Sequence, residues 1–165
     1  MKELLIGCGS RTEKDLSVTG LDTFSNVTRV DSNPDHKPDI LWDLRDHPLP
    51  FNDEEFDEIH AYEVLEHLAN QGDHEFFFNE FTEYHRILKP GGFFMGSVPT
   101  GPWIWGDPSH KRVITRETLV FLDQDNYEQV GTTNMTDFRN IYKADFKLLF
   151  IEELDKLYFI LQKPV

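Results

Sequence analysis

The stretch Leu4-Leu5-Ile6-Gly7-Cys8-Gly9-Ser10 lies almost at the amino terminus and joins an apolar run to a glycine turn. A short run of large apolar residues that ends at glycine is typical of a strand buried on both faces of a parallel sheet. Glycine lets the backbone after such a strand come close to a bound molecule, because it carries no Cβ. The stretch therefore predicts a first parallel strand followed by a ligand-binding turn.

Three further runs predict strands. Residues 27–30 stop at Asp31, residues 40–42 stop at Asp43, and residues 56–62 form a longer run of mixed polarity. Val, Ile and aromatic residues favour strands, whereas Asp, Asn and Pro favour the turns that end them. Ligands bind beyond the carboxyl ends of the strands in an open α/β sheet, so both acids are expected beside the glycine turn.

The second half of the chain predicts two helices and three more strands. Phe77, Phe81, Tyr84 and Leu88 recur at intervals of four, three and four, which places them on one helix face. Lys-Pro-Gly-Gly at 89–92 is expected to end that helix. The remaining expected elements are a strand over residues 93–98, a short helix capped by Thr115 that runs through Leu119 and Leu122, a polar loop over residues 123–145, and an antiparallel hairpin of residues 146–151 and 157–161.

Strands that alternate with helices and then close in a hairpin are typical of an open α/β sheet with one antiparallel edge. Residues 10–26 contain turn formers and little apolar periodicity, so the first crossover helix is expected to be short or missing. The chain has 165 residues and neither an internal repeat nor a linker. It is therefore predicted to form a single domain over residues 1–165.

Composition narrows the class of partner. Lys and Arg total 16 against 30 Asp and Glu, a net charge of −14, which opposes binding to nucleic acid or to anionic lipid. Cys8 is the single cysteine, so an intrachain disulfide is excluded and a cytoplasmic location is expected. No apolar stretch approaches the length needed to cross a membrane, so a soluble protein without a membrane partner is expected.

The spacing of glycines and acids points to an adenosyl ligand. Asp31 stands 22 residues after Gly9, and a carboxylate at the tip of the second strand can accept hydrogen bonds from both hydroxyls of a ribose. Asp43 could accept from the adenine amine, or it could be a turn acid or helix cap. A dinucleotide fingerprint would need a third glycine where Thr12 stands, which weakens the alternative of an oxidoreductase.

Five sequence motifs within about residues 1–100, taken in their order along the chain, resemble those of the class I S-adenosylmethionine-dependent methyltransferases. The resemblance implies a Rossmann-like class I methyltransferase fold, an α/β fold whose mostly parallel seven-stranded sheet ends in an antiparallel hairpin. It also implies methyl transfer to a nucleophile that approaches opposite the sulfonium sulfur. The matching segments are Leu5-Ile6-Gly7-Cys8-Gly9, Val30-Asp31, Asp43-Leu44 with Leu49-Pro50-Phe51, Phe56-Asp57-Glu58-Ile59 through Val64-Leu65-Glu66-His67, and Arg86-Ile87-Leu88-Lys89-Pro90-Gly91-Gly92.

The resemblance implies a set of cofactor contacts. Two positions depart from the family pattern, because Leu5 stands where an acid is frequent and Arg11 stands where a third glycine is frequent. The contact to the amino group of the cofactor must therefore come from elsewhere. The cofactor-binding residues implied by the match are Gly7, Cys8, Gly9 and Ser10 at the methionine end, Asp31 and Ser32 at the ribose, Asp43 and Leu44 at the adenine, and Tyr62 and Glu63 near the methyl donor.

The segment after the fourth strand suggests a metal site. Glu63, Glu66 and His67 stand at i, i+3 and i+4, which would place them on one face of a helix. This E-x-x-E-H is similar to the metal motif of the ubiquinone-pathway and small-RNA 2′-O-methyltransferases, and His110 is expected to complete the set. Carboxylates and imidazole suit Mg²⁺, Mn²⁺ or Zn²⁺. Leu-Glu-His-Leu also occurs in family members without a metal, where the histidine caps a helix or positions substrate.

His67 and Glu63 are the candidate catalytic residues, since a hydroxyl acceptor needs help in losing its proton. Trp103 and Trp105, in a Gly- and Pro-rich loop, are expected to form a substrate lid, with simple packing as the alternative. The predicted function is O- or N-methylation of a small-molecule or glycan acceptor, and the alternative is a non-catalytic methyltransferase-like binding module. The acceptor site is expected to be open or closed by a partner subunit, as in a homo-oligomer.

Overall fold

The computed structural model describes residues 1–165 and contains one seven-stranded sheet of order β3-β2-β1-β4-β5-β7-β6. Pairing from β3 to β5 is parallel, whereas β7 runs antiparallel between β5 and β6. The strands are β1 Glu3–Ile6, β2 Val27–Asp31, β3 Ile40–Leu41, β4 Phe56–Tyr62, β5 Leu88–Pro99, β6 Lys147–Glu153 and β7 Lys156–Gln162. The helices are α1 His74–Ile87, α2 Trp103–Gly106 and α3 Arg116–Leu119, with 3-10 turns η1 Pro34–His36, η2 Leu65–His67, η3 Val120–Leu122 and η4 Gln124–Gln129.

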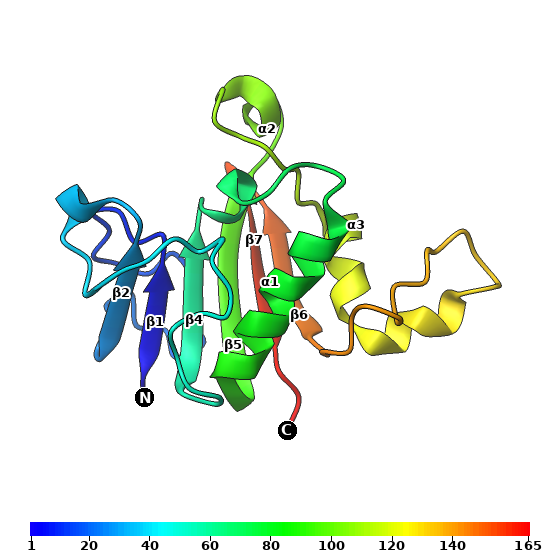
Figure 1. Ribbon diagram of the computed structural model, residues 1–165, viewed down its shortest axis with the longest axis horizontal. Coiled ribbons are helices and arrows are strands. Elements are labelled where there is room, and N and C mark those ends of the chain that lie inside the picture. Colours follow the sequence, from blue (N-terminus) through cyan, green and yellow to red (C-terminus); the bar gives the residue numbers. More distant parts are fainter.

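This architecture confirms the predicted fold class, including the antiparallel hairpin at the carboxyl end. The central strand β1 is buried at all four positions, as its apolar run predicted. The predicted bounds of β4 coincide with the observed Phe56–Tyr62. Figure 1 shows β1, β2, β4 and β5 side by side, with α1 lying across one face of the sheet.

Helix α1 supplies most of the cover on that face. Asp73 caps it by accepting a hydrogen bond from Phe76 N at 3.1 Å, and Phe77, Phe81 and Tyr84 are buried against the sheet. The helix was predicted to include Leu88 and the next strand to begin at residue 93, but α1 ends at Ile87 and β5 begins at Leu88 and runs through the Lys-Pro-Gly-Gly segment. The helix thus passes directly into the strand.

The opposite face has no helix, because residues 7–26 between β1 and β2 form none. The expected loss of the first crossover helix is therefore confirmed. The covering segment is held by an isolated bridge between Glu13 and Thr23. Its apolar contribution is a small cluster in which Leu16 and Phe24 pack against Leu5, Cys8 and Tyr62.

Residues 123–145 are less exposed than their polar composition predicted. Tyr127 and Tyr142 are buried, and Tyr142 donates a hydrogen bond to Leu122 O at 3.1 Å.

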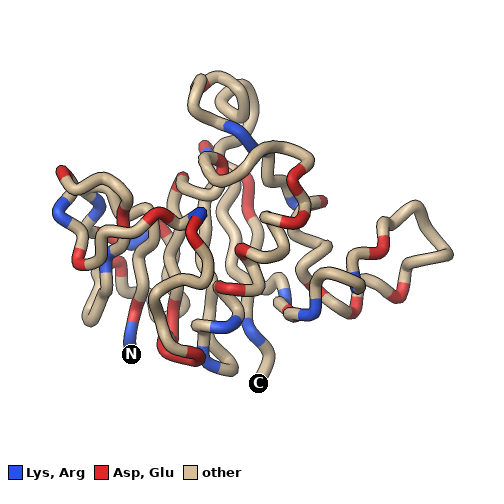
Figure 2. Tube along the Cα trace, in the orientation of Figure 1, with Lys and Arg blue, Asp and Glu red and all other residues tan.

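The predicted cap at Thr115 is confirmed, since its side chain accepts from Thr118 N at the start of α3. Acidic residues outnumber basic ones, 30 to 16, and are spread over many parts of the trace (Figure 2). None of the helices is both long and apolar enough to span a membrane.

Candidate active site

The glycine turn after β1 is held in a shape that needs glycine. Gly7 and Gly9 have φ of 58° and 49°, in the left-handed region. A Cβ on Gly7 would lie 2.3 Å from Val64 Cγ2, so the turn packs directly against the residue that follows β4 by two positions. The carboxyl ends of two neighbouring strands meet at this point.

Asp31 joins the turn to the end of β2. Its Oδ2 accepts a hydrogen bond from Gly9 N at 2.8 Å, and its Oδ1 accepts from Asn33 N at 2.8 Å. Arg29, two residues earlier, donates through Nη2 to the carbonyl oxygens of Gly9 and Arg11 at 3.0 and 3.2 Å. The second strand therefore fixes both the acid and the backbone of the turn.

Two adjoining cavities open at this edge of the sheet. The first has a volume of about 540 Å³ and the second about 500 Å³, and both are lined by Gly7, Gly9 and Glu63. The structure brings all ten sequence-predicted cofactor residues to one or the other. Those of the first cavity alone are Asp31, Ser32, Asp43 and Leu44, and those of the second alone are Cys8, Ser10 and Tyr62.

Asp43 is already engaged by a neighbour. Arg45 donates to its carboxylate through Nε at 3.0 Å and through Nη2 at 2.6 Å, and this contact lowers the pKa of Asp43. Arg45 N also donates to Asp43 Oδ1 at 2.9 Å, the geometry of a turn acid. An adenine amine would have to share this carboxylate with Arg45.

Several lining residues of the first cavity were missed from the sequence. Trp42 directly follows β3, and its position at a strand tip is the signal that could have found it, whereas His36 lies in η1 between β2 and β3. Lys111 and Ser109 come from a loop far along the chain, and no local pattern marks them as neighbours of the glycine turn.

A cluster of one carboxylate and two imidazoles lies where the first cavity approaches residues 109–111. Glu66 Oε1 is 3.8 Å from His67 Nε2 and 4.0 Å from His110 Nε2, and the two rings are 5.0 Å apart at their centroids. Glu66 is buried and its Oε2 has no hydrogen-bond partner. Burial raises the pKa of Glu66 to about 7.

Both histidines are oriented by backbone carbonyls. His110 Nδ1 donates to Trp103 O at 2.8 Å, and His67 Nδ1 lies 3.3 Å from Ser109 O. A proton held at Nδ1 leaves the Nε2 lone pair free. Metal-binding histidines commonly have this arrangement. Nε2 of both rings lies within 4.0 Å of Glu66 Oε1, and that of His110 is also 3.8 Å from Asp107 Oδ2.

The prediction that Glu63 shares a helix face with Glu66 and His67 was wrong. Glu63 has a φ of 55°, and its N donates to Ser97 O at 2.8 Å, which extends the pairing of β4 with β5 past the strand end. Only a single 3-10 turn follows, over Leu65–His67. Glu63 instead lies 3.1 Å from Lys156 Nζ, so the cluster contains His110 but not Glu63.

The loop that carries His110 projects from the carboxyl edge of the sheet and includes α2 (Figure 1). Trp103 and Trp105 are 65% and 57% exposed, so neither is a packing residue of the core. Because His110 is bonded to Trp103 O, this exposed aromatic loop is tied directly to the cluster.

A sheet of this strand order, parallel from β3 to β5 and closed by an antiparallel hairpin, is typical of the class I S-adenosylmethionine-dependent methyltransferases. The profile of the family described as "methyltransferase domain" matches residues 4–96, and the chain belongs to this family. Membership favours an enzyme over a non-catalytic binding module.

Solved structures with the same fold cover almost the whole chain. A SAM-dependent methyltransferase from Archaeoglobus fulgidus aligns with a TM-score of 0.61 at 17% identity, over 98% of this chain and 86% of that one. A complex between the Trm112 methyltransferase activator and a methyltransferase from Haloferax volcanii gives 0.61 at 14%, over 99% and 83%. The trans-methyltransferase CalH in complex with SAH gives 0.58 at 16%, over 99% and 51%. A search of curated protein sequences gives no match.

Proposed function

We propose that the chain transfers the methyl group of S-adenosylmethionine to a hydroxyl or amine of a small-molecule or glycan acceptor. One observation carries the proposal: a single cavity of about 540 Å³ runs from Gly7 and Asp31 to His67 and Ser109. A cofactor lying along the strand tips would share this cavity with His67, one of the two imidazoles beside the buried Glu66. CalH, which shares the fold, is solved with SAH.

The adenosine half would be held by the first cavity. Asp31 is oriented by two backbone N–H groups, so its carboxylate is fixed in place for the ribose hydroxyls. Ser32 would lie beside the ribose, and Leu44 and Trp42 would flank the adenine. Asp43 would share its carboxylate between Arg45 and the adenine amine.

The chemistry asks mainly for alignment and exclusion of water. The acceptor lone pair attacks the methyl carbon, the carbon–sulfur bond breaks, and its electron pair neutralises the sulfonium. The acceptor proton must also leave, and His67 Nε2 is the proposed base, because its Nδ1 lies beside Ser109 O. Glu63 would lie near the methyl group as a positioning residue.

The cluster of Glu66, His67 and His110 also fits a divalent cation. Its three ligand atoms lie within 4.8 Å of one another, and Glu66 Oε2 is a buried acceptor without a partner. Two imidazoles and one carboxylate favour Mn²⁺ or Zn²⁺ over Mg²⁺, which prefers oxygen ligands. Such an ion, when bound, lowers the pKa of an acceptor hydroxyl. In that case His67 would be a ligand and would not act as the base.

Titration calorimetry with S-adenosylmethionine and S-adenosylhomocysteine tests the cofactor. Both are expected to bind, and Asp31→Ala should weaken both, because the ribose hydroxyls lose their acceptor. Asp35→Ala, an exposed acid of η1, is the matched control and should bind like the wild type. Absence of binding by folded wild-type protein would overturn the proposed function.

The metal role is tested by titrating Mn²⁺ and Zn²⁺ into wild type, Glu66→Gln and His110→Ala. Both variants should lose the site, while His36→Ala, which removes a histidine that lines the same cavity outside the cluster, should keep it. Release of S-adenosylhomocysteine with phenols, amines and saccharides as acceptors then reports transfer. Activity that survives exhaustive chelation would contradict the metal role and leave methyl transfer intact.

A further inference from the structure

The methionine end of the cofactor carries a carboxylate, and the usual partner for such an anion is missing from this fold. In α/β proteins the N-terminus of the helix after the first strand commonly binds anions. Residues 7–26 form no helix, so that site does not exist here. A positive group must come from the loop itself.

Arg11 is the one cation that lines the second cavity, beside the glycine turn. Its guanidinium carbon lies 4.8 Å from the centroid of the Tyr62 ring, and its Nη1 is bonded to Asp15 Oδ1. The other guanidinium N–H groups make no hydrogen bond to the protein, and the side chain is 27% exposed. Two parallel N–H groups of a guanidinium match the two oxygens of a carboxylate.

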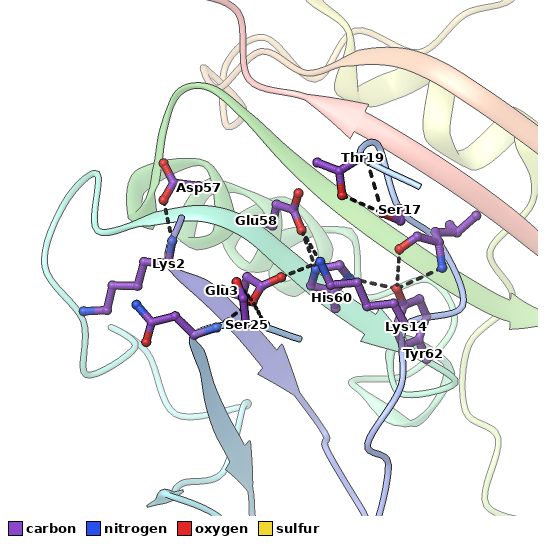
Figure 3. A network of polar contacts seen from close by, with 12 residues as sticks. Lys2, Glu3, Lys14, Ser17, Thr19, Ser25, Asp57, Glu58, His60 and Tyr62 are labelled. Carbon is purple, nitrogen blue, oxygen red and sulfur yellow. Dashed lines mark hydrogen bonds and ion pairs between the residues drawn. The ribbon is translucent and has the colours of Figure 1, made fainter. Parts of the chain in front are cut away.

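The backbone of this loop is anchored beneath the cavity by buried ionic groups. Lys14 Nζ lies between the carboxylates of Glu3 and Glu58, 3.1 Å from Glu58 Oε2, and all three side chains are almost completely buried. Glu3 Oε2 accepts from Ser25 N at 2.8 Å and from Asn26 N at 3.0 Å, so one acid of β1 contacts both Lys14 in the middle of the loop and the carboxyl end of the loop. Figure 3 shows these side chains converging from two strands and the loop.

The same network reaches the ring on which Arg11 stacks. His60 Nε2 lies 3.0 Å from Glu58 Oε2, and His60 Nδ1 lies 2.7 Å from Tyr62 Oη (Figure 3). Tyr62 Oη in turn accepts from Leu16 N at 3.2 Å. A continuous set of contacts therefore runs from Lys14 to the aromatic face below the guanidinium.

We infer that Arg11 binds the carboxylate at the methionine end of S-adenosylmethionine, and that Lys14 is a positioning residue for Arg11 and Tyr62. The inference rests on the proposed function and assigns one of its binding residues. Arg11, at the position of the family's frequent third glycine, thus replaces the missing helix N-terminus.

The test compares ligands with and without the carboxylate. Calorimetry of the wild type should give tight binding of S-adenosylhomocysteine and weaker binding of its carboxyl methyl ester and of 5′-methylthioadenosine. Arg11→Ala should weaken S-adenosylhomocysteine roughly 10- to 100-fold, the range for hydrogen bonds to charged groups, and leave 5′-methylthioadenosine unchanged. Arg11→Lys should recover part of the loss, and Arg116→Ala, on α3, is the matched control.

Lys14→Met should show the same selective loss, because 5′-methylthioadenosine lacks the carboxylate that Arg11 would bind. Arg11→Ala binding S-adenosylhomocysteine like the wild type would overturn the inference while the proposed function stands. Equal weakening of both ligands would also overturn it, since it would indicate collapse of the loop. Wild-type protein that binds none of the ligands would overturn both. If Lys14→Met fails to fold, equal affinity of the wild type for S-adenosylhomocysteine and its ester remains a contradicting result.

Discussion

On one face of the sheet, Leu4 and Ile6 of β1 point into a large apolar core beneath α1, whereas on the other face Glu3 and Glu58 are buried around Lys14. The difference follows from what covers each face. A helix brings a stripe of large apolar side chains. The loop over residues 7–26 brings few, so buried ion pairs and hydrogen bonds must hold it in place.

Carboxyl groups on the two faces have opposite pKa shifts. Burial raises the pKa of Glu80, on α1, to about 8, and neither its bond to Tyr84 nor the nearby Arg112 compensates. Burial also disfavours ionised Glu3, but hydrogen bonds from Asn26, Lys14 and Ser25 outweigh it and lower the pKa of Glu3 to about 2. Glu3 on the loop face is therefore favoured as the ion, whereas Glu80 on the helix face is favoured as the neutral acid.

The largest expected effect tests the helix face. Phe81→Ala removes a fully buried ring that lies 5.5 Å from the Phe94 ring, and it should cost about 3 to 5 kcal/mol of unfolding free energy. Urea unfolding measures the loss. Phe150→Ala, at an exposed position of β6, is the control and should change stability by less than about 1 kcal/mol. A loss for Phe81→Ala no larger than that of the control would contradict the apolar account of this face.

The second prediction tests the loop face. Lys14→Met leaves two buried carboxylates without their cation and should cost about 3 kcal/mol. Adding Glu58→Gln should recover part of this loss, because one uncompensated charge is removed. Lys2→Met, which breaks the half-exposed pair with Glu55, is the matched control and should cost under about 1 kcal/mol. No recovery in the double variant would show that packing, and not charge, holds the loop.

The same contrast explains what could be predicted from sequence. The strands and α1 could be predicted because each buries one or both faces. Burial of a face leaves a pattern of apolar residues in the local sequence. The loop over residues 7–26 could only be predicted as lacking a helix. Nothing in the pattern shows that Lys14 would meet Glu58, since burial of an ion pair depends on how distant segments pack.

The residues of the candidate site also divide into those that local sequence could predict and those that depend on how distant segments pack. Gly7, Asp31 and Asp43 were predictable because strand tips in a parallel sheet converge by topology. Glu63 was misplaced, because a helical spacing was assumed where β4 continues to pair with β5 through Ser97. Lys111 reaches the cavity through a loop for which the sequence gives no register.

A smaller expected effect is that the buried acids of the two faces change the stability of the protein in opposite directions with pH. The pKa of Glu80 lies above its unfolded value of 4.5, so its contribution to stability is complete below pH 4.5 and is lost as pH rises to about 8. The pKa of Glu3 lies below its unfolded value of 4.5. The contribution of Glu3 to stability is therefore complete above pH 4.5 and is lost as pH falls to about 2. Glu80→Gln should therefore shrink the fall in melting temperature between pH 5 and pH 8, measured by calorimetry. Glu75→Gln, an exposed acid of the same helix, should leave it unchanged. An unaltered fall in Glu80→Gln would contradict the assignment.

The smallest effect concerns the link between the buried network and the cofactor cavity. Tyr62→Phe keeps the ring beneath Arg11 but removes the hydroxyl that contacts His60 and accepts from Leu16 N, so it should cost about 1 to 2 kcal/mol. Hydrogen exchange at the Leu16 amide should accelerate by more than global destabilisation explains, because its acceptor is gone. Tyr158→Phe, whose hydroxyl bonds only the exposed Asp155, is the control. Because the ring remains, S-adenosylhomocysteine should weaken less than in Arg11→Ala. An unchanged Leu16 exchange rate would mean that the ring alone, without the hydroxyl, fixes the loop over the cofactor site.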